Sequence, residues 1–211
     1  MSPPKSPPPR KRSRKTPRRA AGADRMPPLP AARLTRAQRR AARELEAGPR
    51  GKVIGPFVAA LRSPELMSRL QRLGEYLRYH NALGRRLTEL AVLLTARAWT
   101  QQFEWALHVD IAAEEGVPRA VIDAIAAGRR PKTLAPTDSA VYDFFVELRD
   151  TQAVSDATYA RAVAALGEAG VIDLIGVIGY YSTLAMIMNV ARTPLPPGRT
   201  AQLAPPRGRE K

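Results

Sequence analysis

The sequence of 211 residues predicts an all-α fold. Three observations lead to this prediction. Apolar residues recur at three- and four-residue spacing through most of the chain, and helix-capping residues, glycine and proline separate the periodic segments. No segment shows the alternation of apolar and polar residues that is typical of a half-buried strand. Since 45% of the residues are hydrophobic, the chain can build one core, and a single domain with flanking tails is expected.

Four helices are predicted in the first half of the domain. The first begins after Thr35 as N-cap and ends at Gly48, and residues 49–55 form a linker. After a short apolar turn, the break at Ser63-Pro64 starts a helix that closes near His80. That helix carries an apolar stripe of four leucines, Leu66, Leu70, Leu73 and Leu77. The third and fourth helices cover residues 85–99 and 103–115 and are separated by a bend at residues 100–102.

The second half predicts a short helix and then three longer ones. Pro118 opens the short helix and Gly128 ends it, and Thr137 or Asp138 is expected to cap the next helix. Ser155 caps a helix that stops at Gly167, and the last helix runs from about residue 170 to Val190. This last segment is long enough to cross a membrane, but it contains Asp173 and several small polar residues. It is therefore interpreted as a buried helix of a soluble protein, without membrane contact.

The formal charge of +15 belongs to the ends of the chain. Residues 1–25 carry +8, residues 26–50 carry +4 and residues 192–211 carry +4, which leaves about −1 for residues 51–191. Residues 1–33 are rich in proline and arginine and are expected to be disordered, followed by a helical domain over 34–197 and a disordered tail over 198–211. The basic N-terminal tail could bind a polyanion such as nucleic acid, but a solvated tail is favoured, and Met26 is an alternative start of the protein.

The chain contains no cysteine. Disulfides, thiolate metal ligands and thiol nucleophiles are therefore excluded for this sequence. The N-terminus has no apolar stretch of secretory length, so a cytoplasmic location is expected.

The strongest candidate site is the pair Glu104 and His108. Because they are four residues apart in a predicted helix, they lie about one turn apart on the same face. His108 could act as general acid and base, with Glu104 setting its tautomer or basicity. The alternatives are an ordinary pair on the helix surface or a buried hydrogen-bonded pair that holds the bend at residues 100–102.

Three further residues are candidates for substrate binding. Tyr180 and Asn189 are polar groups in the long apolar helix, and Trp105 lies beside Glu104. Trp105 also fits a core or subunit-interface aromatic, and Tyr181 is interpreted as a packing residue. No metal site is expected, because Asp110 falls on a different face of the helix from His108 and one His with one carboxylate is a poor ligand set. No cofactor is expected either.

The order of these motifs resembles the carboxymuconolactone decarboxylase family, which is related to the alkylhydroperoxidase D-like (AhpD-like) proteins. The resemblance covers roughly residues 50–197 and rests on EWALHVDIAAEEGV, VIDAIAAGRRP and the segment from AVYDFFVELRD to MIMNV followed by PLP. It implies an AhpD-like helical fold that assembles into trimers or hexamers. The family includes lactone decarboxylases of aromatic catabolism and peroxidases that use a CxxC thiol. Glu104 and His108 match the region of that motif, whereas its cysteines are missing here.

Three functional hypotheses follow from the residues and the resemblance. The first is a thiol-independent lyase that decarboxylates a small carboxylated lactone or a related catabolic acid. The second is an oligomeric or ligand-binding member of the family without catalytic activity. The third is a polyanion-binding protein that acts through the N-terminal tail. Thiol-dependent peroxidase activity is not expected, because the chain lacks the thiol.

Overall fold

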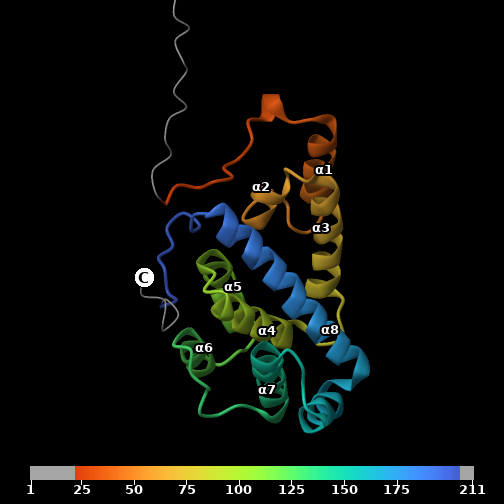
Figure 1. Ribbon diagram of the computed structural model, residues 1–211, viewed down its shortest axis with the longest axis vertical. Coiled ribbons are helices and arrows are strands. Elements are labelled where there is room, and N and C mark those ends of the chain that lie inside the picture. Colours follow the sequence, from red (N-terminus) through yellow and green to blue (C-terminus); the bar gives the residue numbers. More distant parts are fainter. Residues whose placement is uncertain (1–21, 205–211) are drawn as a thin grey trace, which may run out of the picture.

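The computed structural model describes residues 22–204, and within that range the protein is helical with no strand. One short 3-10 helix precedes the α-helices. In chain order the elements are η1 (Ala31–Arg33), α1 (Arg36–Ala47), α2 (Pro56–Ala60), α3 (Pro64–Tyr79), α4 (Arg85–Ala98), α5 (Gln102–Glu114), α6 (Arg119–Ala126), α7 (Pro136–Thr151) and α8 (Asp156–Ala191). The all-α prediction is confirmed (Figure 1).

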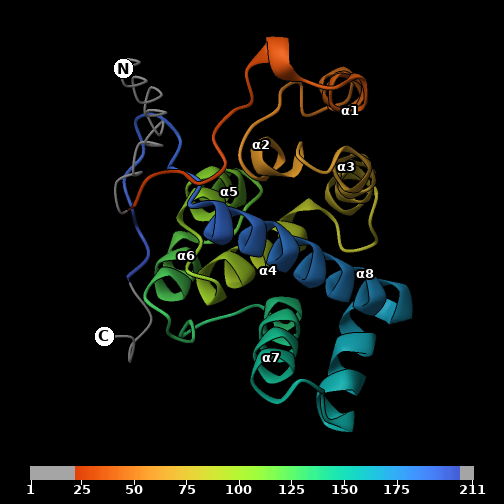
Figure 2. The ribbon, with the colours of Figure 1, turned by 45° about the horizontal axis from the view of Figure 1, so that its top comes forward.

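Helix α4 forms the centre of the core. Every residue from Thr88 to Ala96 is buried, so the helix is enclosed on all sides, as expected for a core helix. It packs against α5, α7 and α8. Figure 2 shows α8 crossing the molecule between α2 and α3 on one side and α4 and α7 on the other.

The bend predicted between the third and fourth helices is confirmed. Helix α4 ends at Ala98 and α5 begins at Gln102. Thr100 has a positive φ of 49°, a conformation that a β-branched residue rarely adopts. The side chain of Gln101 accepts a hydrogen bond from the amide of Phe103 and so caps the start of α5. This turn places α5 alongside α4.

Two details of the helix predictions are corrected. In α3, Leu70 and Leu77 are buried, whereas Leu66 and Leu73 are 47% and 46% exposed, because the buried face also includes Met67 and Gly74. The stripe of four leucines is therefore split between core and surface.

The predicted cap of the helix after the short one, which is α7 in the structure, is wrong as well. Helix α7 begins at Pro136, and Asp138 lies inside its first turn. Asp138 is buried and accepts hydrogen bonds from both Nη atoms of Arg86, including one of 3.0 Å from Nη1. This ion pair joins the start of α4 to α7. By contrast, Thr35 and Ser155 cap α1 and α8 as predicted.

Helix α8 is broken at Gly167, where the backbone takes φ 71° and ψ 167°, in agreement with the predicted stop. Beyond this kink, Asp173 is buried and accepts hydrogen bonds from the hydroxyl of Tyr76 at 3.0 Å and the amide of Ala82 at 2.7 Å. Within residues 22–204, α8 is one helix with the length and apolar composition of a membrane span, a property that core helices share. Asp173 has its partners inside the protein.

Parts of both predicted tails are held against the domain. Residues 22–33 do not follow the predicted disorder, since the amide of Arg25 donates to the carbonyl of Ala191 and Arg62 donates to the carbonyl of Pro27. At the other end, Leu203 is 4% exposed and its carbonyl accepts a hydrogen bond from Gln102. The rest of the two predicted tails, residues 1–21 and 205–211, lies outside the described residues.

Candidate functional site

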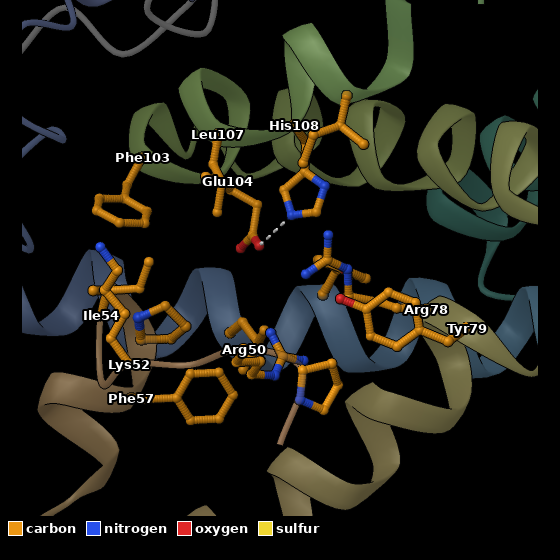
Figure 3. Close-up of a pocket in the computed structure, with 15 residues that line it drawn as sticks. Arg50, Lys52, Ile54, Phe57, Arg78, Tyr79, Phe103, Glu104, Leu107 and His108 are labelled. Atoms are coloured by element: carbon orange, nitrogen blue, oxygen red, sulfur yellow. Dashed lines mark ion pairs between the residues drawn. The ribbon is translucent and has the colours of Figure 1, made fainter. Parts of the chain in front are cut away.

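A cavity of about 160 Å³ lies between α5, the segment before α2, the end of α3 and α8. Its apolar wall comprises Phe57, Phe103, Leu107 and Leu184. Glu104 and His108 point into it from α5, and Arg50 and Arg78 approach from the opposite side (Figure 3). The cavity therefore combines an apolar wall with acidic, basic and imidazole groups, as small-molecule sites commonly do.

His108 lies between two buried carboxylates. Its Nδ1 atom is 2.6 Å from Oε2 of Glu89 on α4, and its Nε2 atom is 3.8 Å from Oε1 of Glu104 on α5. All three side chains are at most 5% exposed. Because Glu89 accepts a hydrogen bond at Nδ1, the proton of a neutral His108 resides there and Nε2 is left as the acceptor that faces Glu104. The arrangement fixes the tautomer of His108.

The two carboxylates have different environments. Burial raises the pKa of Glu104 to about 7, although His108, Arg50 and Arg78 each act to lower it. Burial also acts to raise the pKa of Glu89, but the charge and hydrogen bond of His108, together with Arg78, outweigh it and lower that pKa below its ordinary value. Glu89 is thus the permanent anion, while Glu104 can hold or release a proton near neutral pH.

Three buried polar atoms around the cavity have no hydrogen-bond partner within the described residues. They are Oε2 of Glu104, Nε of Arg50 and the hydroxyl oxygen of Tyr181. Arg78 also makes no hydrogen bond there, and its guanidinium lies over the ring of Tyr79. Since buried polar groups are normally paired, this set of free donors and acceptors is what a polar ligand would satisfy.

Tyr180, predicted to bind substrate, lies behind the cavity wall. Its hydroxyl accepts a hydrogen bond of 3.1 Å from Nη2 of Arg50, and burial raises its pKa to about 12. It therefore positions Arg50. Tyr181, which the sequence assigned to packing, lines the cavity instead, and its ring meets that of His108 edge to face at 5.2 Å.

The structure does not bring Trp105 and Asn189 to this cavity. Trp105 is 1% exposed and its indole nitrogen donates to Gln202, so it anchors the C-terminal segment. Asn189 accepts from Gln101 and donates to the carbonyl of Trp99, at the turn between α4 and α5. Both residues lie on other faces of their helices from the residues that line the cavity.

The sequence analysis missed Glu89, Arg50 and Arg78. A signal was present for Glu89, which stands inside the apolar segment LTELAVLL, where an unpaired charge would be costly. No pattern identifies the arginines, because they reach the cavity from segments 26 and 54 residues before Glu104.

No group of three or more His, Asp or Glu side chains within residues 22–204 has the geometry of a metal site. Asp110, the third acidic group near the motif, forms an ion pair with Arg199 at the surface. The residues around His108 therefore do not fit a resident metal ion.

Part of the chain matches a known protein family. Residues 64–145 match the carboxymuconolactone decarboxylase family, and this match includes Glu89, Glu104 and His108. The sequence alone matches no curated protein.

Solved structures share the fold at low sequence identity. One is a protein of unknown function from Agrobacterium tumefaciens that has been related to the antioxidant defence protein AhpD. It is 19% identical with a TM-score of 0.58, over 65% of this chain and 94% of that one. The debrominase Bmp8 is 13% identical with a TM-score of 0.63, over 82% of this chain and 92% of that one. A Bmp8 variant with a cysteine replaced by alanine, in complex with 2,3,4-tribromopyrrole, gives the same identity and TM-score over 91% of its chain.

Residues 64–145 therefore match the carboxymuconolactone decarboxylase family, the chain shares its helical fold with the AhpD-like structure, and it contains no cysteine.

Proposed function

We propose that the protein is a lyase that decarboxylates a small carboxylated lactone, or a related catabolic acid, by thiol-independent acid and base chemistry. One observation carries the proposal. Glu104 is buried with an unpaired oxygen, has a pKa of about 7 and lies 3.8 Å from the acceptor nitrogen of His108 in the wall of a cavity that two arginines also line. Perturbed acids beside a fixed imidazole in a cavity favour proton transfer over a purely structural pair.

The arginines are suited to the negative charge that develops during the reaction. When the bond to the departing carboxylate breaks, carbon dioxide leaves and the electron pair moves onto the lactone carbonyl as an enolate. An arginine bound to the departing carboxylate would stabilise the substrate and slow this step. We therefore assign Arg50 and Arg78 to the enolate oxygen and to any carboxylate that remains on the product.

The proton required at carbon comes from Glu104 or His108. Near neutral pH, a protonated Glu104 can donate to the carbanionic carbon directly or through Nε2 of His108. Glu89 stabilises the cationic form of His108 while the proton is passed on, because its own pKa stays low. The free hydroxyl of Tyr181 can donate to a substrate oxygen.

One of the comparisons supports a small cyclic substrate. The Bmp8 variant binds 2,3,4-tribromopyrrole, so the fold can hold a small ring in at least one protein. Bmp8 is named as a debrominase, and the Agrobacterium tumefaciens protein is related by name to antioxidant defence. For this chain, a thiolate mechanism for either activity is excluded, because it has no cysteine. Decarboxylation needs no thiol.

We also infer a cytoplasmic location. The partners of Asp173 and the burial of Leu174, Val177 and Leu184 support α8 as a core helix.

The proposal is tested by following carbon dioxide release from a panel of carboxylated five-membered lactones. Turnover is expected for the wild-type protein, with a loss of about 10²- to 10⁴-fold in His108→Gln and Glu104→Gln, the usual contribution of a general acid or base. Asp110→Asn, which changes an acidic residue at the surface of the same helix, is the matched control and should retain activity. The proposal would be contradicted if the wild-type protein neither turned over nor bound any lactone of the panel.

A further inference from the structure

A second hollow, separate from the cavity at His108, lies at the C-terminal end of α4. It consists of a cavity of about 860 Å³ between α4, α7 and α8 and one of about 560 Å³ between α4, α6 and α7. Both are lined by Ala98, Thr100 and Arg149, and these two adjoining cavities are together called the α4 groove below. None of the residues that line the His108 cavity lines the α4 groove.

One half of the α4 groove is apolar and aromatic. Trp99 is 39% exposed, whereas Trp105, the other tryptophan of the chain, is 1% exposed. Phe145, Leu148 and Ile178 line the same half. An exposed tryptophan beside aliphatic and aromatic side chains presents a surface suited to a flat apolar group.

The other half is basic. Nη1 of Arg97 donates to Oγ1 of Thr100 at 3.4 Å and to the carbonyl of Ala204 at 3.2 Å, but its Nε atom is buried without a partner in the described residues. The side chain of Arg129 makes no hydrogen bond or ion pair with residues 22–204, and it lines the groove.

Arg149, at the junction of the two halves, is paired with Asp150 through Nε and Nη2. Arg97, Arg129 and Arg149 line this half of the groove, and only the last of them is paired with a carboxylate among residues 22–204, that of Asp150. Gly128, with φ +67°, leaves room for Arg97, since an added Cβ would come within 3.0 Å of its Nη2 atom. Arg97 and Arg129 therefore both line this half of the groove and keep donors without a partner among residues 22–204.

We propose that the α4 groove binds a small amphipathic anion, an aromatic or acyl carboxylate whose apolar body lies against Trp99 and whose carboxylate is held by Arg97 and Arg129. Guanidinium groups bind carboxylates in bidentate geometry, and the unpaired donors of Arg97 and Arg129 are available for it. Thr100, which has a strained φ of 49°, lies at the junction of the two halves. Strained backbone conformations are commonly found in binding sites. This site does not depend on the activity proposed for His108.

The experiment uses isothermal titration calorimetry of the full chain with naphthalene-2-carboxylate. The neutral alcohol of the same ring system, 2-naphthylmethanol, is the control ligand. The carboxylate is expected to bind at least about tenfold more tightly than the alcohol. The double variant Arg97→Gln/Arg129→Gln should remove that advantage and leave the affinity for the alcohol unchanged. Arg119→Gln, the same charge change on α6 outside the groove, should bind as the wild-type protein does.

Two further variants locate the ligand. Ser182→Phe places a ring in the apolar half and should weaken the binding of both compounds. His108→Gln should leave both affinities unchanged. Loss of carboxylate binding in His108→Gln would place the ligand in the other cavity and overturn the proposal. The proposal would also be overturned if the wild-type protein and the double arginine variant bound the carboxylate with equal affinity. It would be overturned as well if neither compound bound and sedimentation experiments showed that a second copy of the chain covers the groove.

Discussion

Nδ1 of His108 lies 2.6 Å from Oε2 of Glu89, a residue 19 positions earlier on the neighbouring helix. This contact decides which nitrogen of His108 faces the cavity. With Nδ1 occupied by Glu89, Nε2 is directed toward Glu104 at 3.8 Å. The proposed proton transfer therefore depends on α4 and α5 keeping their mutual position.

Glu89→Gln is expected to reduce the rate of the proposed reaction at least about tenfold with little change in KM, because Gln can still accept from Nδ1 but no longer stabilises a cationic His108. The folded protein should also lose about 1–2 kcal/mol at pH 7, the difference between a charge-assisted and a neutral hydrogen bond. Since the pKa of Glu89 is lowered by His108 and Arg78 despite its burial, this stability is present above the ordinary pKa of 4.5 and is lost as the pH falls through the lower folded value. Urea unfolding at pH 7 and pH 4 measures the change. An equal loss at both pH values would contradict this account.

The sequence predicted the parts of the molecule that depend on local patterns. Helical spacing, the caps at Thr35 and Ser155 and the stop at Gly167 are read from neighbouring residues, and the structure confirms them. Glu104 and His108 could be paired in advance because they share one face of one helix. Glu89, Arg50 and Arg78 could not, because their contacts with the site depend on how separate helices pack.

The predicted helix cap at Asp138 was wrong for a related reason. Aspartate is a common residue at helix caps, but the ion pair of Asp138 with Arg86 on another helix places it inside α7. Trp105 and Asn189 were predicted to bind substrate, but Gln202 and Gln101 hold them away from the His108 cavity. Asn189 lines the α4 groove instead.

Glu104→Gln is expected to stabilise the protein at pH 8 while reducing its activity. Burial raises the pKa of Glu104 from 4.5 to about 7, so its favourable contribution is present below pH 4.5 and is lost as the pH rises through 7. Above pH 7 the ionised side chain costs roughly 3 kcal/mol relative to a neutral one, at about 1.4 kcal/mol for each pKa unit. Thermal unfolding should therefore give Glu104→Gln a higher Tm than the wild-type protein at pH 8 and a similar Tm at pH 4. A lower Tm for the variant at pH 8 would show that Glu104 is a stabilising ion-pair partner.

Apolar residues on the outer face of α8 predict where the homo-oligomer expected from the sequence forms. Ile172, Ile175, Met186 and Val190 are 67%, 44%, 42% and 56% exposed. A double variant, Ile172→Glu/Met186→Glu, should shift the protein to smaller species in light scattering coupled to size exclusion, because it would bury charges in a subunit contact. Tyr159→Glu, at an exposed position before the kink at Gly167, is the control and should not. Unchanged mass in the double variant would exclude this face.

Asp173→Asn is expected to destabilise the protein by about 1–3 kcal/mol, because the carboxylate is buried and accepts hydrogen bonds from both Tyr76 and Ala82. The amide of asparagine retains one acceptor oxygen, but its NH2 group would face the hydroxyl of Tyr76 or the amide of Ala82, which are themselves donors. Asp110→Asn at the surface should change stability by less than about 0.5 kcal/mol, as is usual for exposed positions. Equal effects of the two substitutions in urea unfolding would mean that the Asp173 contacts do not hold the loop between α3 and α4.

Gly74→Ala tests the packing of Gly74 against Tyr180 and Arg50, behind the cavity, without changing any polar group. A Cβ at Gly74 would lie 2.0 Å from the hydroxyl of Tyr180 and 2.5 Å from Nη2 of Arg50, so both side chains must move. We expect a stability loss of about 1–3 kcal/mol from overpacking and a raised KM for an anionic substrate, because Arg50 loses its position. Gly179→Ala is the matched control on α8, where an added Cβ meets nothing within 4 Å. That substitution should stabilise the helix by up to about 1 kcal/mol and leave KM unchanged. If Gly74→Ala lowered stability but KM stayed at the wild-type value, Arg50 would have no part in substrate binding.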